Sequence, residues 1–183
     1  IGLTLKTCRV AVLPGDGIGP EVIDATVRVL KAVEAEARAY RLDLVWGEAG
    51  FGVISKYGTN MPPKTIEMLK TTVACLKGPM TTPEEPGAPP SVALTIRKFF
   101  DLYANVRPCH SLPNVPSLKP NIDLTIVREN TEDMYSGIEF DVSDGVAVAM
   151  RVITRKASER VARFAFKLAS QRRKHLSYVH KAN

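Results

Sequence analysis

An apolar run that stops at a glycine-rich turn and is followed by a helical pattern most constrains the fold of this chain. Residues 8–13 (CRVAVL) are nearly all apolar and end at the turn PGDG, 14–17. Such a run predicts a buried strand that leads into a tight turn. From about residue 20 to residue 40, apolar side chains recur at three- and four-residue spacing. This spacing predicts a helix, with Pro20 in its first turn.

Strand and helix patterns alternate along most of the remaining chain. Short apolar or β-branched runs predict strands, and stretches with three- and four-residue apolar spacing predict helices. The alternation is typical of an α/β fold with a largely parallel sheet. The predicted strands are 42–46, 72–78, 101–106, 122–128 and the closing segment 175–183, and the predicted helices are 62–71, 91–100 and 157–170.

One stretch departs from this alternation. Residues 135–140 and 146–154 flank the turn signal Asp144-Gly145, which predicts a β-hairpin. We expect this hairpin to form a protruding arm. Two proline-rich segments, 79–90 and 108–120, are expected to be connections between elements.

The composition excludes several classes of protein. The 183 residues, 45% hydrophobic and 24% charged, are typical of a folded globular chain. No apolar run reaches the roughly 20 residues that span a bilayer, and the first residues lack the features of a signal peptide, so no membrane partner is expected. Cys8, Cys75 and Cys109 are too far apart for a disulfide scaffold or a zinc site, which favours a reducing compartment.

The net charge of +6 is compatible with nucleic acid or with small anions as ligands. Nucleic-acid surfaces usually cluster lysine and arginine with interleaved aromatic residues. The one dense basic cluster, 172–174, lies at the end of a predicted helix, where the helix dipole favours cations. We therefore expect no nucleic-acid partner.

Three single arginines are candidates for binding an acidic substrate. Arg97, Arg107 and Arg128 each lie at the end of an apolar segment, and ligands of α/β sheets collect at strand ends. The planar guanidinium binds a carboxylate through two hydrogen bonds, so three of them suit a substrate with several carboxylates. Spacing alone leaves open the alternative of three separate surface salt bridges.

A glycine-rich turn and two side chains, Tyr135 and Lys181, are further candidates for ligand binding and proton transfer. The turn GDGIG, 15–19, could form an anion or nucleotide site at a helix N-terminus, although its spacing does not match the dinucleotide fingerprint and a purely structural turn is the alternative. Tyr135 and Lys181 carry candidate proton-transfer groups. The alternatives are a packed hairpin tyrosine and an exposed lysine.

Several motifs occur together in an order that resembles one family. They are PGDGIGPE (14–21), LKGPMTTP (76–83), SVALTIRK (91–98), LYANVRP (102–108), IVRENTEDMYSGIE (126–139) and VHKAN (179–183). This set resembles the β-decarboxylating dehydrogenases, which include the isocitrate, homoisocitrate and 3-isopropylmalate dehydrogenases. The resemblance covers almost the whole chain, and its two last motifs are the most specific.

The resemblance implies a role for each candidate residue. Tyr135 would protonate the enol that follows decarboxylation, and Lys181, donated across a dimer, would assist removal of the substrate hydroxyl proton. A base, a nicotinamide and a divalent metal, Mg²⁺ or Mn²⁺, would complete the reaction, with NAD or NADP as the hydride acceptor. Substrate carboxylates would be bound by Ser91, Arg97, Arg107 and Arg128, and the nicotinamide end of the cofactor would lie near Ile18, Lys77, Thr81 and Thr82.

The resemblance also implies an architecture that this chain fills only in part. Family members are roughly twice as long, and their metal-binding aspartates come later, so no metal ligand is expected in this segment. We expect the first half of a large domain over 1–103 and part of a small α/β domain over 104–183, with a dimer-clasping hairpin at 135–154. The segment alone should be unstable and inactive, because its half-sheet would leave an open edge. A homodimer with shared active sites is expected, in the cytoplasm or, in a eukaryote, the mitochondrial matrix.

Within the family, the motifs favour isocitrate as the substrate. ENTED replaces the Leu-Thr-Gly-Gly-type sequence of isopropylmalate enzymes, and SGIE and LPNVPS resemble isocitrate dehydrogenase. Ala93 stands where isocitrate enzymes usually have Asn, which keeps homoisocitrate as an alternative. A non-catalytic regulatory subunit of a hetero-oligomeric isocitrate dehydrogenase is the alternative of another class. It is disfavoured because the three arginines, Tyr135 and Lys181 are all present.

Overall fold

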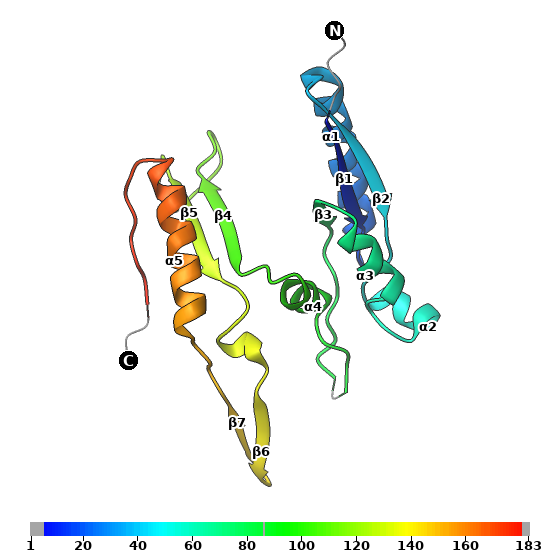
Figure 1. Cartoon of the computed structure of the whole chain (residues 1–183), viewed down its shortest axis with the longest axis vertical. Coiled ribbons are helices and arrows are strands. Elements are labelled where there is room, and N and C mark those ends of the chain that lie inside the picture. The colour runs from blue at the N-terminus through cyan, green and yellow to red at the C-terminus, as the bar shows by residue number, and fades with distance from the viewer. Residues whose placement is uncertain (1–5, 86, 181–183) are drawn as a thin grey trace. The chain divides into compact units, whose positions relative to one another are not determined.

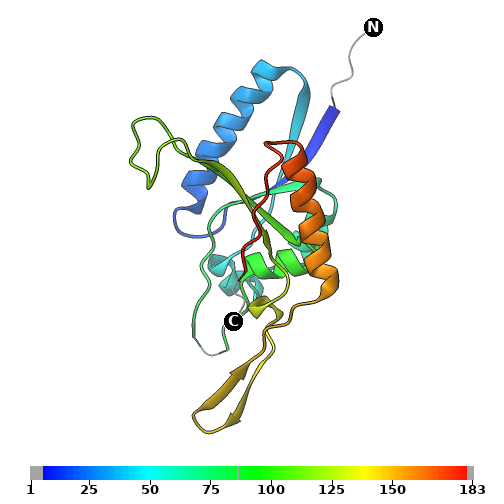
Figure 2. The same cartoon turned by 90° about the vertical axis from the view of Figure 1, so that its left-hand side faces the viewer.

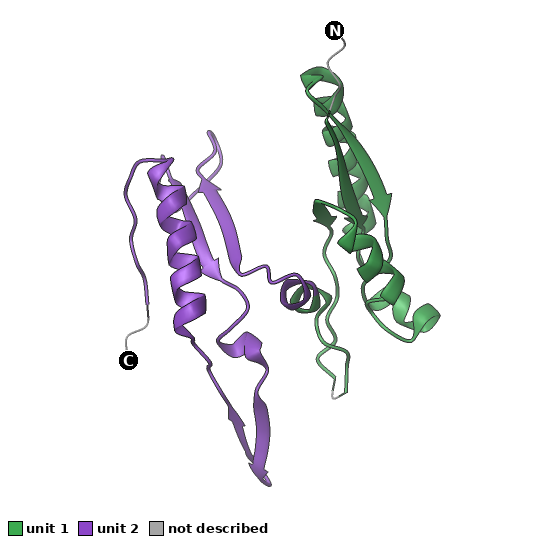
Figure 3. Cartoon of the chain, viewed as in Figure 1, with its two compact units in different colours: residues 1–95 green, residues 96–183 purple. Residues whose placement is uncertain are grey.

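The computed structural model describes residues 6–85 and 87–180, and it divides the chain into two compact units, 1–95 and 96–183 (Figures 1 and 3). Strands and helices alternate in it, which confirms the predicted α/β fold. Unit 1 contains β1 (Lys6–Leu13), α1 (Gly19–Ala37), β2 (Tyr40–Trp46), the 3₁₀ helix η1 (Phe51–Val53), α2 (Ile54–Tyr57), α3 (Pro63–Lys70) and β3 (Ala74–Lys77). Helix α4 (Val92–Phe99) begins in unit 1 and ends in unit 2, which contains β4 (Ala104–His110), β5 (Asp123–Glu129), the 3₁₀ helix η2 (Met134–Ser136), β6 (Glu139–Ser143), β7 (Val146–Ala149) and α5 (Arg155–Ser170).

The core of unit 1 is built around strand β1. This strand is the middle one of a parallel three-stranded sheet in the order β2-β1-β3. Ala11, Val12 and Leu13 are fully buried, and Ile23 of α1 and Leu69 of α3 are buried as well. A central parallel strand needs apolar side chains on both faces, which explains why its sequence is a continuous apolar run.

Helix α1 ends earlier than its apolar spacing predicted. Arg38 takes a left-handed conformation, with φ of 48°, and its backbone N–H donates to the Glu34 carbonyl at 3.3 Å. This bond closes the last turn as a helix C-cap. The chain is thereby free to enter β2 at Tyr40.

The sheet of unit 2 has two antiparallel strands, with Asn105 of β4 opposite Arg128 of β5. Helix α5 covers one face of it, where Arg172 lies 2.6 Å from Asp123. Side chains alternate between the two faces of a strand, so the even-numbered positions of β5 point away from α5. Leu124 and Ile126 at these positions are 44% and 50% exposed, so this second face is open within the unit.

Strand β4 begins and ends later in the chain than the strand predicted at 101–106. It begins only at Ala104, because Asp101 has a φ of 48° and turns the chain after α4. It then continues through Pro108 to His110, where a connection was predicted. Proline is tolerated in a strand whose second edge pairs with no neighbour, since its missing N–H leaves no ladder bond unmade. In the described part of unit 2, β4 pairs only with β5.

The predicted hairpin is present, with shorter strands than expected. β6 and β7 pair antiparallel around the turn at Asp144 and Gly145, where Gly145 has a φ of 72°. Every residue of both strands is exposed, and Figure 2 shows the hairpin extending away from the rest of its unit. The segment before β6 forms η2 instead of strand.

The closing segment does not form the strand that its sequence predicted. Residues 175–180, the part of it that the structure describes, are assigned neither strand nor helix. A strand requires a hydrogen-bonded neighbour, and no described segment pairs with these residues. Among the described residues, no helix is long and apolar enough to cross a membrane.

Candidate functional site

The open face of the β4–β5 sheet carries two of the predicted arginines. Asn105 and Arg107 lie two residues apart on β4, and Arg128 is the cross-strand partner of Asn105. Because side chains at i and i+2 share a face, Asn105, Arg107 and Arg128 all lie on the face that α5 leaves open. We call these three residues, together with Tyr135, the arginine face.

Tyr135 is joined directly to this face. Nη2 of Arg128 donates a hydrogen bond of 2.6 Å to the phenol oxygen of Tyr135, and the guanidinium carbon lies 5.1 Å from the ring centroid. The phenol oxygen accepts this bond and therefore keeps its own proton available for donation. A bound molecule at this point would meet a fixed cation and a proton donor together.

Arg107 is oriented by a residue that sequence reasoning missed. Its Nε donates to Oδ1 of Asn105 at 3.1 Å. This bond uses the inner nitrogen and leaves the two outer nitrogens free to bind a carboxylate. Its position in the sequence could have identified it, because Asn105 lies two residues before Arg107 in a predicted strand and therefore on the same face. Neither Arg107 nor Arg128 forms an ion pair with a carboxylate in the described part of the chain.

Arg97 lies close to the turn that carries Tyr135. It occupies the last turn of α4. The neighbouring Lys98 donates from Nζ to the Ser136 carbonyl at 3.3 Å, which places this end of α4 beside η2. No described contact joins Arg97 itself to the arginine face. Ser91 directly precedes α4 in unit 1, where its carbonyl accepts the backbone N–H of Thr95 at 2.9 Å.

The loop between β5 and η2 is held by a partly buried carboxylate. Glu129 accepts hydrogen bonds from the backbone N–H groups of Thr131 and Glu132, both at 2.9 Å, and from the Thr131 hydroxyl at 2.6 Å. Burial alone would raise the pKa of Glu129, but these donors outweigh it and hold the pKa below its ordinary value. The loop therefore leaves β5 in a fixed direction.

A second group of predicted residues gathers around Asp16 in unit 1. The Asp16 carboxylate accepts three backbone N–H groups, from Phe51 and Gly52 at 2.8 Å and from Thr81 at 2.9 Å. Burial would raise the pKa of Asp16, but these amides and the nearby Lys77 ammonium hold it below its ordinary value. Asp16 thus joins the glycine turn, η1 and the loop after β3.

The glycines of this turn are required by close packing. A Cβ on Gly15 would lie 2.0 Å from the Pro79 carbonyl oxygen, and a Cβ on Gly78 would lie equally close, 2.0 Å, to the Pro14 carbonyl oxygen. No side chain fits at either position. Asp16 was missed by sequence reasoning, although an acid between two glycines after a buried strand was the signal for it.

The predicted cofactor residues surround this cluster. Ile18 is 67% exposed at the start of α1, beside Gly17, whose missing Cβ faces open space. Lys77 ends β3 and donates from Nζ to the Gly78 carbonyl at 2.7 Å. Thr81 is fixed by Asp16, and Thr82 follows it in the same loop. The surface beside Gly17 and Ile18 is therefore open.

Neither the predicted lysine nor a metal-binding cluster is found among the described residues. Lys181 lies outside them. Within them, no three side chains among His, Cys, Asp and Glu come together to hold a metal ion.

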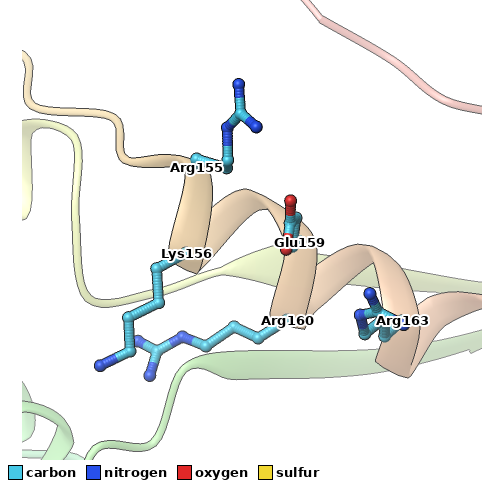
Figure 4. Close-up of a pocket in the computed structure, with 5 residues that line it drawn as sticks. All are labelled: Arg155, Lys156, Glu159, Arg160 and Arg163. Carbon is cyan, nitrogen blue, oxygen red and sulfur yellow. The ribbon is translucent and has the colours of Figure 1, made fainter.

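A basic hollow on α5 has a different character (Figure 4). Arg160 contributes to it, but its guanidinium is bound to Asp101 at 2.6 Å and to the Thr131 hydroxyl at 2.9 Å, and it lies over the Tyr103 ring. These contacts anchor α5 to its unit, so we assign the hollow a structural role. Its lining residues, none of them predicted for the site, are Arg155, Lys156, Glu159, Arg160 and Arg163.

Comparison with known proteins places almost the whole chain in one family. The family model described as isocitrate/isopropylmalate dehydrogenase matches residues 9–183. The 3-isopropylmalate dehydrogenase of Saccharolobus solfataricus is 44% identical over 97% of this chain and 51% of its own length. The NADP isocitrate dehydrogenase of Thermus thermophilus is 43% identical over 95% of this chain and 35% of its own length.

A solved structure supports the same placement. The isocitrate dehydrogenase of Methylococcus capsulatus has a TM-score of 0.82 and 38% sequence identity, covering 90% of this chain and 48% of that one. The chain therefore spans about half the length, or less, of these relatives. The names of the relatives differ in substrate, and one from Pyrococcus horikoshii is an isocitrate/homoisocitrate dehydrogenase.

Proposed function

Because the chain belongs to the isocitrate/isopropylmalate dehydrogenase family, we propose that its protein oxidises and decarboxylates isocitrate to 2-oxoglutarate and reduces NAD or NADP. The observation that carries this proposal is the arginine face, where two guanidiniums and a phenol occupy one open surface. A substrate with several carboxylates needs this combination of cations and a proton donor. Homoisocitrate and 3-isopropylmalate are the alternative substrates.

The arginines would fix the substrate. Arg107 and Arg128 present outer guanidinium nitrogens on the same face, and Arg97 and Ser91 would add contacts from either end of α4. Fixing a flexible acid in one pose removes much of the entropic barrier to reaction.

Two side chains would handle the protons. Lys181, contributed by the partner in a homodimer, would assist removal of the substrate hydroxyl proton. Tyr135 would donate its phenol proton to the enol carbon once carbon dioxide has left, while the Arg128 hydrogen bond stabilises the oxygen that becomes negative.

The cofactor would lie against unit 1. Ile18, Lys77, Thr81 and Thr82 would surround the nicotinamide ring, which accepts hydride from the substrate carbon when bound. The described residues offer no ligand set for Mg²⁺ or Mn²⁺, so the metal of the proposed reaction needs ligands from elsewhere in the assembled protein.

The substrate can be identified by a direct assay. The protein at its natural length is assayed for NADH and NADPH formation with isocitrate, homoisocitrate and 3-isopropylmalate, each with Mg²⁺. We expect the highest kcat/KM with isocitrate. Preference for homoisocitrate would agree with Ala93, and preference for 3-isopropylmalate would contradict the substrate proposed here. Turnover of none of the three would favour the regulatory-subunit alternative.

Tyr135→Phe tests the assigned chemistry. General acid catalysis contributes a factor of about 10² to 10⁴, so we expect kcat to fall at least about 100-fold. The KM for the acid should change much less, because the arginines remain. Tyr40→Phe, the same change at the start of β2, is the matched control and should keep full turnover. Equal kcat for Tyr135→Phe and wild type would remove Tyr135 from the mechanism.

A further inference from the structure

Asp133, two residues before Tyr135, has an unusual backbone conformation. Its φ and ψ are 63° and −133°. This region is that of the first central residue of a type II′ turn, which is usually glycine, because a Cβ is crowded there. A side chain at this position persists only when its surroundings hold it, and such strain concentrates at functional sites.

Two contacts from the far side of the hairpin hold Asp133 in this conformation. Nε and Nη2 of Arg151 donate to its two carboxylate oxygens at 2.5 Å and 2.7 Å, and its backbone N–H donates to the Val152 carbonyl at 2.8 Å. The Arg151 guanidinium therefore binds the Asp133 carboxylate through two parallel hydrogen bonds. This geometry fixes orientation as well as distance.

Hydrogen bonds link the backbone of Asp133 directly to the turn that carries Tyr135. The Asp133 carbonyl accepts the Ser136 backbone N–H at 3.2 Å and the Ser136 hydroxyl at 2.8 Å. These bonds close η2, so the Asp133 carbonyl direction sets the direction in which Tyr135 leaves the backbone. At the other end of the side chain, Arg128 holds the phenol oxygen.

We propose that Arg151, through its two-point contact with Asp133, is a positioning residue for Tyr135. Arg151 forms no described contact with the arginine face, and it acts by holding a strained backbone that aims the Tyr135 phenol at Arg128. This inference rests on the role of Tyr135 in the proposed function. It assigns a function to the base of the hairpin that the family motif does not.

The test uses the protein at its natural length and three substitutions. Arg151→Met removes both bonds, and we expect kcat to fall at least about tenfold with KM for the acid nearly unchanged, since misplacement of about 1 Å can cost up to about 100-fold. Arg151→Lys restores one point of contact and should recover part of the loss. Asp133→Gly relieves the backbone strain but removes the carboxylate that Arg151 binds. Turnover should therefore fall without a fall in the thermal midpoint.

A spectroscopic measurement separates positioning from a general loss of structure. The protein is labelled with fluorotyrosine, and the ¹⁹F resonance of Tyr135 is assigned by its absence in Tyr135→Phe. We expect Arg151→Met to shift or broaden this resonance and to leave the others in place. Arg172→Met is the matched control: it breaks the Arg172–Asp123 pair, of 2.6 Å, at the opposite end of β5, and should affect neither the resonance nor kcat.

The outcomes distinguish this inference from the proposed function. An unmoved Tyr135 resonance in Arg151→Met, or unchanged kcat in a protein where Tyr135→Phe is impaired, would overturn the positioning role. A fall of kcat together with a rise of KM and a fall of the thermal midpoint in all three variants would do the same, because it would show a structural role alone. Full turnover by Tyr135→Phe would instead overturn the function assigned to Tyr135, whatever the resonance does.

Discussion

Asp16 shows how one carboxylate can join segments that lie far apart along the chain. Its oxygens bind backbone N–H groups from segments 35, 36 and 65 residues away along the chain. Carboxylates bind N–H donors strongly, and each donor would otherwise be left without a partner in a half-buried turn. The loop that carries Thr81 and Thr82 is therefore held to the glycine turn by this residue.

We expect Asp16→Asn to destabilise the protein by about 1–3 kcal/mol, because an NH₂ group would face backbone donors. The KM for the nicotinamide cofactor should also rise, since the Thr81 loop would no longer be fixed. Urea unfolding and initial rates at varied cofactor concentration measure the two effects. Asp24→Asn, the same change on the exposed face of α1, is the control. Similar behaviour of the two variants would show that the amide contacts do not matter.

Among the elements of unit 1, α2 and α3 are linked by Glu48. Its carboxylate accepts a hydrogen bond of 2.5 Å from the Tyr57 hydroxyl, and Lys56 and Lys64 lie at 2.9 Å and 3.1 Å. These three donors, Tyr57 first, lower the pKa of Glu48 from 4.5 to about 2. The group is exposed, so salt screens part of this interaction.

The lowered pKa of Glu48 predicts a pH-dependent contribution to stability. A carboxyl whose pKa is lower in the folded state stabilises that state above its unfolded pKa and loses the effect as the pH falls through its folded pKa. The wild type should therefore exceed Glu48→Gln in urea midpoint at pH 6, and the difference should shrink between about pH 4.5 and pH 2. High salt should reduce it as well. A difference that is constant with pH would contradict the assigned pKa.

At the scale of the whole molecule, the two units differ in how much apolar surface they bury. Unit 1 has a core around Val12 and Leu13, whereas the buried apolar residues described in unit 2 are Ile96 and Ala157. The open sheet face and the hairpin strands carry exposed apolar side chains, such as Ile126 and Phe140, and so does the connection that contains Leu118. A two-stranded hairpin without a partner is at best marginally stable in water.

The 183 residues produced by themselves should therefore not behave as a stable globular protein. We expect them to bind a hydrophobic dye such as ANS, to elute as species larger than 20.0 kDa and to lack turnover, because exposed apolar faces and strand edges associate. The protein at its natural length, measured alongside, should do none of these. A monomer of 20.0 kDa with a sharp unfolding transition would contradict the prediction.

Features that depend on neighbours along the chain could be predicted from the amino-acid sequence. The apolar run of β1, the spacing in α1 and α5 and the Asp144-Gly145 turn are local patterns, and the structure contains each of these elements. The ordered motifs also pointed to the family to which the chain belongs. The closing segment shows the limit, because a strand pattern at 175–180 forms no strand without a neighbour.

The contacts that hold the candidate site together join residues that are far apart along the chain. Arg151 and Asp133 are 18 residues apart, and Thr81 and Asp16 are 65 apart. Backbone N–H groups carry no residue-specific signal, and the cross-strand register that opposes Asn105 to Arg128 depends on how two strands align. Contacts of this kind arise from folding in three dimensions, so a pattern read along one dimension proposed candidate reacting groups but missed the residues that contact them.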